Sequence, residues 1–218
     1  MNIDPLHFCI AIAPLSVYLV MLGLLNLQRR SFVTTGARDA AALGIAISGL
    51  VVAGPMELFF PESAASQYGS YVWILLLAFY GLCVSLVVLL MRSRIVIYNI
   101  NSEQLRPILN QVAMELDKKS RWTGDSLLIP ELNVHLHLEP VDWLRNVQLT
   151  SGGTNQSFEG WRKLETELRS ALKPIRVRSN ILGIGFLLIA GALAVSSAGW
   201  MISDPQSVAQ SLDDLLRR

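Results

Sequence analysis

Four long apolar runs, almost free of charged residues, constrain this chain more than any other feature. They cover residues 5–27, 40–60, 71–91 and 181–202 of the 218 residues. About 20 consecutive apolar residues suffice for a helix to cross the hydrocarbon core of a bilayer. Core helices of soluble proteins seldom run this long without a charged face. The sequence therefore predicts an α-helical membrane protein with four transmembrane helices.

The placement of arginine predicts how these helices are oriented, because cytoplasmic loops carry an excess of Lys and Arg. Arginines follow the first and third runs and precede the fourth, and the segment 61–70 has no Lys or Arg (Arg29, Arg30, Arg38, Arg92, Arg94, Arg176, Arg178). We therefore expect both termini outside and residues 93–178 in the cytoplasm, in a plasma or bacterial inner membrane. The glycosylation pattern at Asn155 should then stay unmodified.

The predicted domain organisation follows from these runs. Residues 1–92 hold three transmembrane helices, residues 93–178 a cytoplasmic α/β domain, residues 179–202 the fourth transmembrane helix, and residues 203–218 a short amphipathic tail. The small core that about 85 residues allow makes the inserted domain a single unit.

Residues 93–178 combine strand and helix patterns. Alternating or β-branched segments predict strands, and apolar residues at helical spacing predict two helices (strands near 94–100, 126–130, 132–139 and 146–150; helices at 101–119 and between Ser157 and Pro174). The simplest packing is an antiparallel-rich sheet with both helices on one face. We expect an arrangement of ferredoxin-like type, in which the other face of the sheet is open unless another segment covers it.

Two histidines in this domain are candidate metal ligands. Alternation along a strand puts His135, His137 and Glu139 on one face. A zinc site needs three or four ligands, so Glu139 or Glu131 would have to complete it. One alternative is a solvent-facing strand on which any polar residue serves. Another is a face that binds a partner or responds to pH, since His titrates near neutrality. We favour both alternatives over a metal site.

Glu57 is a carboxylate inside the second apolar run, just beyond the helix-breaking pair Gly54-Pro55. Polar groups inside membranes are functional by default. Counted from Ala40, however, Glu57 lies roughly 25 Å along a helix, near the outer edge of a core about 30 Å thick. We expect a helix terminus at the interface, and a functional acid of a transporter or channel is the alternative.

Arg38 and Asp39 open the same run from its cytoplasmic side. Opposite charges at a helix start are ordinary interfacial anchors, and an aspartate there also suits the helix dipole. A gating role is the alternative functional interpretation of this pair.

Small residues recur in two of the runs at a spacing that lets helices approach closely in lipid. They form one stripe in the second run and another in the fourth (Ala41, Ile45, Gly49 and Ala53; Ala190, Ala194 and Ala198). We expect internal packing faces, with a homo-oligomer contact as the alternative.

The sequence carries no catalytic triad, no nucleotide-binding motif and no cysteine cluster, so we expect neither a cofactor nor enzymatic activity. A net charge of +1 gives no basic field to attract nucleic acid. The expected role is structural, scaffolding or regulatory, with the lipid bilayer and other membrane or cytoplasmic proteins as partners. The alternatives are a transporter or channel subunit that uses Glu57 and a membrane-bound metalloenzyme that uses His135 and His137.

Overall fold

The computed structural model describes residues 5–141, 144–153, 156–203 and 205–217, so Asn155 lies outside the described residues. The chain forms two compact units, each assembled from distant parts of the sequence. The first contains Met1–Leu22, Ala41–Leu89 and Gly185–Arg218, and the second contains Gly23–Ala40 and Leu90–Ile184. The second unit thus takes in the loop between the first two apolar runs as well as the predicted domain.

Four long apolar helices confirm the four predicted runs. Their bounds lie within a few residues of the prediction (α1 Pro5–Leu27; α2 Gly36–Val51, extended by a π-helical segment Val52–Met56; α4 Tyr71–Leu90; α7 Leu182–Ser203). Each is long and apolar enough to cross a membrane. Two shorter helices, α3 (Glu62–Tyr68) and α8 (Pro205–Arg217), complete the first unit.

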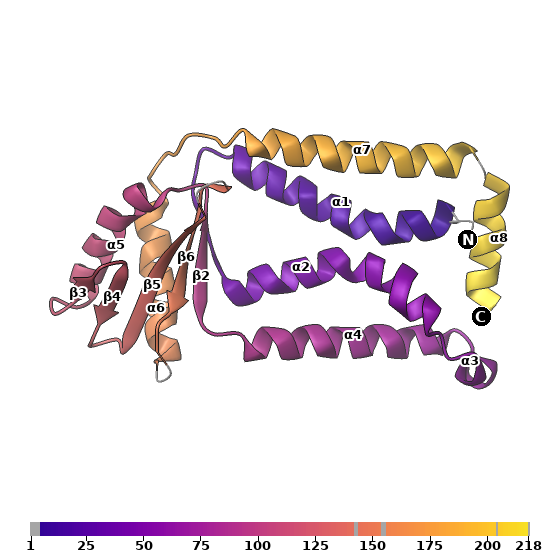
Figure 1. The fold of residues 1–218 in the computed structure, drawn as a ribbon, viewed down its shortest axis with the longest axis horizontal. Helices are drawn as coiled ribbons and strands as arrows, with labels where there is room; N and C mark the ends of the chain where they lie inside the picture. The colour runs from indigo at the N-terminus through magenta and orange to yellow at the C-terminus, as the bar shows by residue number, and fades with distance from the viewer. Residues whose placement is uncertain (1–4, 142–143, 154–155, 204, 218) are drawn as a thin grey trace. The chain divides into compact units, whose positions relative to one another are not determined.

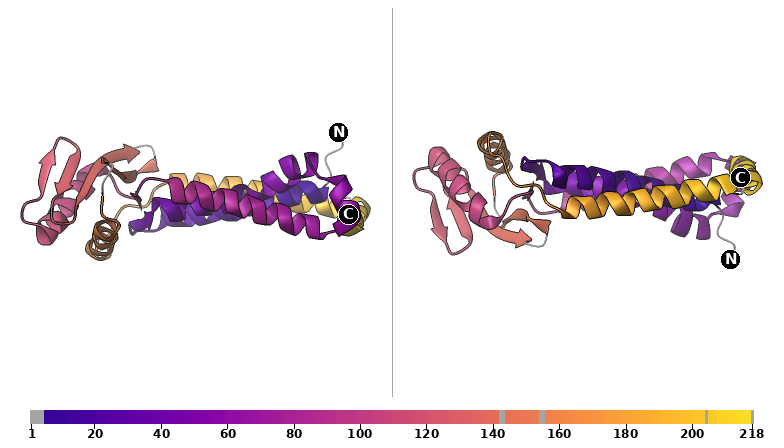
Figure 2. Two further views of the ribbon diagram at one scale, coloured as in Figure 1. Left: turned by 90° about the horizontal axis from the view of Figure 1, so that it is seen from below. Right: turned by 90° about the horizontal axis from the view of Figure 1, so that it is seen from above.

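Within the first unit the long helices run alongside one another, as Figures 1 and 2 show. A Cβ atom added at Gly49 of α2 would stand 2.1 Å from the carbonyl oxygen of Ile10 in α1, and one at Gly44 would stand 2.7 Å from Val84 of α4. The rings of Phe8 and Trp200 join α1 to α7, with centroids 5.4 Å apart. Glycine is therefore required where α2 touches α1.

The predicted small-residue stripes are only partly contact faces. Gly49 is buried in α2 but Ile45 is 69% exposed, and Ala190 is buried in α7 while Ala194 and Ala198 are exposed. The buried small residues of α7 recur every seven positions instead, at Gly183, Ala190 and Ser197. A four-residue step overshoots a helical turn by about 40°, whereas seven residues make nearly two full turns. Residues spaced four apart therefore rotate away from the contact face along the helix, whereas residues spaced seven apart stay on it.

The second unit is a six-stranded sheet with two helices. The strands lie in the order β1-β2-β6-β5-β4-β3, and all neighbouring pairs are antiparallel (β1 Phe32–Thr35, β2 Arg94–Tyr98, β3 Arg121–Thr123, β4 Ser126–Ile129, β5 Val134–Val141, β6 Asn146–Ser151). The helices α5 (Ser102–Leu116) and α6 (Phe158–Leu172) pack on one core with the strands. That core includes Leu109, Leu149 and Leu168, each fully buried.

The prediction of a ferredoxin-like domain is wrong. That fold is built from βαβ units, in which a helical crossover joins parallel strands. Here α5 leads instead into a hairpin of β3 and β4, whose turn uses Gly124 at φ 63°. The chain then returns through β5 to β6, which pairs antiparallel with β2. The three-residue strand β3 was not predicted, because so short a segment carries too little periodicity.

Strand β1 was also missed, because it lies in the predicted loop between the first two apolar helices. Phe32 pairs with Tyr98 and Thr35 with Ile95, so β1 forms one edge of the sheet. Val33 is 4% exposed and enters the core. The loop is thus a structural part of the sheet domain.

The sheet face opposite α5 and α6 is only partly open. Val96 and Tyr98 of β2 are covered, at 2% and 8% exposed, whereas His137 and Glu139 of β5 are exposed. Alternation along β2 puts Val96 and Tyr98 on this face, because Ile95 enters the core. The covered half therefore lies at the β1-β2 side of the sheet.

Buried asparagines connect the ends of the apolar helices to this sheet. The backbone N–H of Asn180 donates to the carbonyl oxygen of Asn26 at 2.9 Å, and its side-chain amide donates to the carbonyl oxygen of Leu144 at 3.0 Å. The Asn99 amide donates to the Gln28 carbonyl oxygen. Asn26, Asn99 and Asn180 are at most 6% exposed. Buried amides need such partners, so these bonds fix the chain segments that precede β1 and α7.

Candidate functional site

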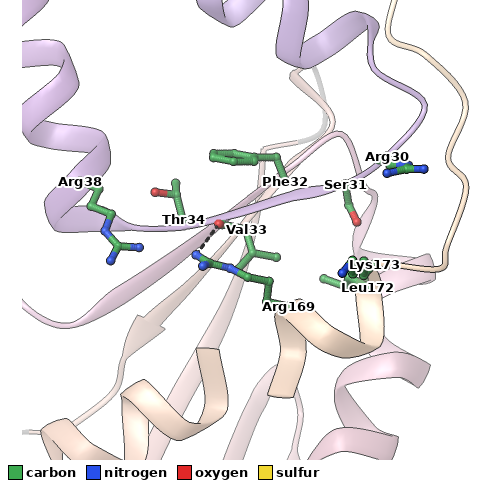
Figure 3. Close-up of a pocket in the computed structure, with 9 residues that line it drawn as sticks. All are labelled: Arg30, Ser31, Phe32, Val33, Thr34, Arg38, Arg169, Leu172 and Lys173. Atoms are coloured by element: carbon green, nitrogen blue, oxygen red, sulfur yellow. Dashed lines mark hydrogen bonds between the residues drawn. The ribbon is translucent and has the colours of Figure 1, made fainter. Parts of the chain in front are cut away.

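A pocket in the second unit lies between edge strand β1 and the C-terminal half of α6 (Figure 3). Its volume is about 390 Å³, and nine residues line it (Arg30, Ser31, Phe32, Val33, Thr34, Arg38, Arg169, Leu172 and Lys173). Five of them come from β1 and the two residues before it, one (Arg38) from the first turn of α2, and three from α6 and the residue after it. β1 brings these groups together because it forms the sheet edge beside α6.

The lining is strongly basic. Arg30, Arg38, Arg169 and Lys173 are cationic, and none of the nine lining residues is a carboxylate. Cations that line one pocket concentrate anions there, and guanidinium groups bind carboxylate or phosphate through paired hydrogen bonds. The pocket is therefore suited to an anion.

Glu165 of α6, which does not line the pocket, holds two of these arginines. Its Oε1 lies 2.8 Å from Nη2 of Arg169 and 3.5 Å from Nη1 of Arg38. Arg169 Nη2 also donates to the carbonyl oxygen of Val33 at 3.1 Å, the bond dashed in Figure 3. One carboxylate against four cations leaves a local charge of +3 (4 − 1). Glu165 therefore orients the arginines without neutralising the site.

Ser31 adds a polar group that lacks a protein partner. Its hydroxyl is buried and makes no hydrogen bond within the part of the chain that the structure describes. Buried hydroxyls are nearly always paired. In Figure 3 this hydroxyl lies on the α6 side of β1, toward Lys173. A donor is thus available beside the cations.

Of the candidates named from the sequence, Arg38 is placed at this pocket and Asp39 is not. Asp39 accepts a hydrogen bond of 2.5 Å from the Tyr98 hydroxyl, which ties the first turn of α2 to β2. The adjacent charges therefore have different tasks: Arg38 faces the pocket, and Asp39 anchors the helix start.

Glu57 and Pro55 lie in the first unit, at the far end of α2. Glu57 Oε1 is 3.0 Å from His7 Nε2 of α1, and both side chains are about one-third exposed or less. The helix continues through Pro55: Val52–Met56 form a π-helical turn, and α-helical backbone resumes at Glu57. A π turn inserts a residue into the helical ladder, which accommodates the proline.

His135 and His137 occupy β5 with the predicted alternation, since Leu136 and Leu138 between and beyond them are buried. His137 Nδ1 lies 3.1 Å from the Ser126 hydroxyl. In the described residues, no group of three or more His, Cys, Asp or Glu side chains is placed to hold a metal. The structure thus supplies the two imidazoles without a third ligand, and the metalloenzyme alternative has no support from this geometry.

Sequence reasoning missed Arg30, Ser31, Arg169 and Lys173 as site residues. Arg30 served only to predict orientation, and the two α6-side cations are 139 residues or more away from it in the chain. The signal available was β-branched and aromatic enrichment in "FVTT" beside a basic doublet. Comparisons with protein-family models, with curated proteins and with solved structures find no match to this chain.

Proposed function

We propose that this chain is a multi-pass membrane component with a scaffolding or regulatory role, exerted through its sheet domain on the cytoplasmic side of a plasma or bacterial inner membrane. The observation that carries the proposal is strand β1. It lies between two apolar helices in sequence, yet it pairs with β2 of the domain. A partner that binds the domain would therefore act on segments continuous with the helices.

The connections between the strands and the apolar helices that support this proposal are short in sequence. β1 ends at Thr35 and α2 begins at Gly36, and only three residues separate the end of α4 at Leu90 from the start of β2 at Arg94. The first turn of α2 directly follows β1, so a partner that shifts β1 acts next on that turn. A ligand changes a conformational equilibrium only if it binds the two states with different affinity. Because β1 is directly connected to α2, a partner bound to the sheet domain can act on the start of that apolar helix.

The exposed polar half of the sheet is the surface we assign to the protein partner. His137 and Glu139 of β5 lie beside Gln148 and Thr150 of β6. A photoreactive amino acid at Glu139 should yield a discrete cross-linked product in native membranes. The same group at the exposed Lys163 of α6 should not. Equal products from both positions would contradict the assignment.

Membrane orientation has its own test. Single cysteines are introduced at Ser66 and Lys163 in a chain whose Cys9 and Cys83 are changed to alanine. In intact cells a membrane-impermeant maleimide should label the Ser66→Cys variant, and it should label the Lys163→Cys variant only after permeabilisation. Labelling of Lys163→Cys in intact cells would reverse the orientation and refute a cytoplasmic domain.

A transport role is the second candidate, because the Glu57–His7 pair joins α1 and α2 beside a π-helical turn. Such turns are frequent at functional sites, and ionisable groups in apolar helices mark ion or solute paths. Flux in reconstituted vesicles should fall strongly in Glu57→Gln if this role is real. Parent vesicles without flux for any of the tested ions would remove the candidate.

A further inference from the structure

We infer that the pocket between β1 and α6 binds a phosphate-bearing anion, either the headgroup of an anionic phospholipid or a soluble phosphate compound. The inference goes beyond the proposed function, since anion binding requires neither a protein partner nor a particular orientation in the membrane. It rests on the charge, the unpartnered hydroxyl and the apolar wall of this one pocket.

The charge and size of the pocket favour phosphate. Four cations line the pocket from three chain segments: Arg30 before β1, Arg38 in α2, and Arg169 and Lys173 at and just after the end of α6. Guanidinium pairs and an ammonium match the several oxygens of a phosphate better than the two of a carboxylate. The volume of about 390 Å³ is at the small end of ligand sites. It therefore accepts a phosphate with a small attached group.

Contacts among the described residues use only a few of the hydrogen-bond donors at this pocket. Glu165 contacts one guanidinium nitrogen of Arg38 and one of Arg169, whereas each guanidinium has five N–H donors. The Ser31 hydroxyl is buried and has no partner among the described residues. A bound phosphate oxygen would accept from this hydroxyl, and a buried polar atom without a partner otherwise costs stability.

The remaining walls suit a ligand with an apolar part. Val33 of β1 and Leu172 of α6 line the pocket with apolar side chains. Arg38 lies two residues into α2, whose apolar segment continues to Met56. Juxtamembrane basic residues attract anionic lipids, so a lipid headgroup is one source of the phosphate. A sugar or glycerol phosphate from solution is the other.

The test uses the purified full chain and two matched double variants. Arg30→Gln/Lys173→Gln removes two pocket cations, and Arg162→Gln/Lys163→Gln removes two exposed cations of α6 that do not line the pocket. Glycerol 3-phosphate is titrated in neutral detergent. Nanodiscs of phosphatidylcholine, with and without phosphatidylglycerol, are used to measure lipid occupancy by native mass spectrometry.

We expect the pocket variant to lose about tenfold or more in binding while the surface variant retains it. If the pocket variant loses only phosphatidylglycerol binding in nanodiscs, the ligand is the lipid headgroup. If it also loses glycerol 3-phosphate binding in detergent, the pocket is a general phosphate site. Equal loss in the two double variants would show only surface charge and would overturn the inference. Absence of binding by the parent chain in both arms would do the same.

A second variant keeps the test decisive if Arg30→Gln/Lys173→Gln does not fold. Ser31→Asp places a carboxylate in the pocket while keeping every cation, and it should abolish binding of both probes. Ser66→Asp, outside the pocket, is its matched control. Unchanged phosphate binding in a folded Ser31→Asp variant would refute the site. The cross-linking test at Glu139 is unaffected by either result, so the two proposals fail separately.

Discussion

The Tyr98 hydroxyl donates a hydrogen bond of 2.5 Å to the Asp39 carboxylate. Tyr98 ends β2, and Asp39 lies in the first turn of α2. The bond is of the short kind that a carboxylate acceptor favours, and an acidic residue in the first turn also suits the helix dipole. One side-chain pair thus fixes the start of an apolar helix against the sheet.

Tyr98→Phe should destabilise the chain by about 1–3 kcal/mol, because it leaves a half-buried carboxylate without its charge-assisted partner. Urea or thermal unfolding in detergent, followed by tryptophan fluorescence, measures the change. Tyr71→Phe is the matched control, since Tyr71 is 71% exposed, and it should change stability by no more than about 0.5 kcal/mol. Equal stability of the two variants would show that the Tyr98–Asp39 bond contributes nothing.

The long helices were predictable because the apolar pattern that specifies each of them extends over many residues. About 20 apolar residues make a helix of membrane length evident from composition alone, and α6 repeats its buried leucines at helical spacing. Strand β1 has four residues and one core side chain, Val33. Its pairing with β2, some 60 residues later, depends on tertiary packing, which no local pattern reports.

The candidate site was less predictable than the fold for the same reason. Arg38 was singled out, but its pocket partners Arg169 and Lys173 lie more than 130 residues away. The Glu57 interpretation lacked His7, which approaches only because α1 and α2 pack together. The sequence shows where each charged residue lies along the chain. Only the folded structure shows which charged side chains lie near one another.

Gly49→Ala should loosen the packing of α1 on α2. Its new Cβ would stand 2.1 Å from the Ile10 carbonyl oxygen, which is backbone and cannot rotate away. Overpacking of this kind costs about 1–3 kcal/mol, and the midpoint of SDS-induced unfolding should fall accordingly. Gly81→Ala in α4 is the control, because nothing lies within 4 Å of its added Cβ. An unchanged midpoint in Gly49→Ala would contradict the close α1–α2 contact.

Asn180→Ala should weaken the junction that leads into α7. The side-chain amide of Asn180 donates to Leu144, and its Oδ1 accepts from the N–H of Leu182 at 3.1 Å. Removing the amide leaves the carbonyl oxygen of Leu144 without this hydrogen bond and should lower the free energy of unfolding by about 1–3 kcal/mol. Thermal unfolding should show the loss, whereas Gln111→Ala on the exposed side of α5 should remain close to the parent. Matching losses would argue against a structural role for the buried amide.

Asp117 makes the stability of the sheet domain depend on pH in the acidic range. The backbone N–H of Glu131 donates to its Oδ2 at 2.9 Å, and that of Lys119 donates to its Oδ1 at 2.7 Å. These bonds hold the pKa of Asp117 below its ordinary value of 3.8. Because the folded pKa is the lower one, the stabilisation is fully present above the unfolded pKa and is lost as pH falls through the folded pKa.

Asp117→Asn should therefore lower the unfolding temperature at neutral pH, since an amide accepts more weakly than a carboxylate. The gap between parent and variant should be constant above about pH 5 and should shrink as the pH falls below the ordinary aspartate pKa. Thermal melts across this range measure the gap, with Glu167→Gln as the control for an exposed carboxylate on α6. A gap that persists unchanged at low pH would show that ionisation of Asp117 does not stabilise the fold.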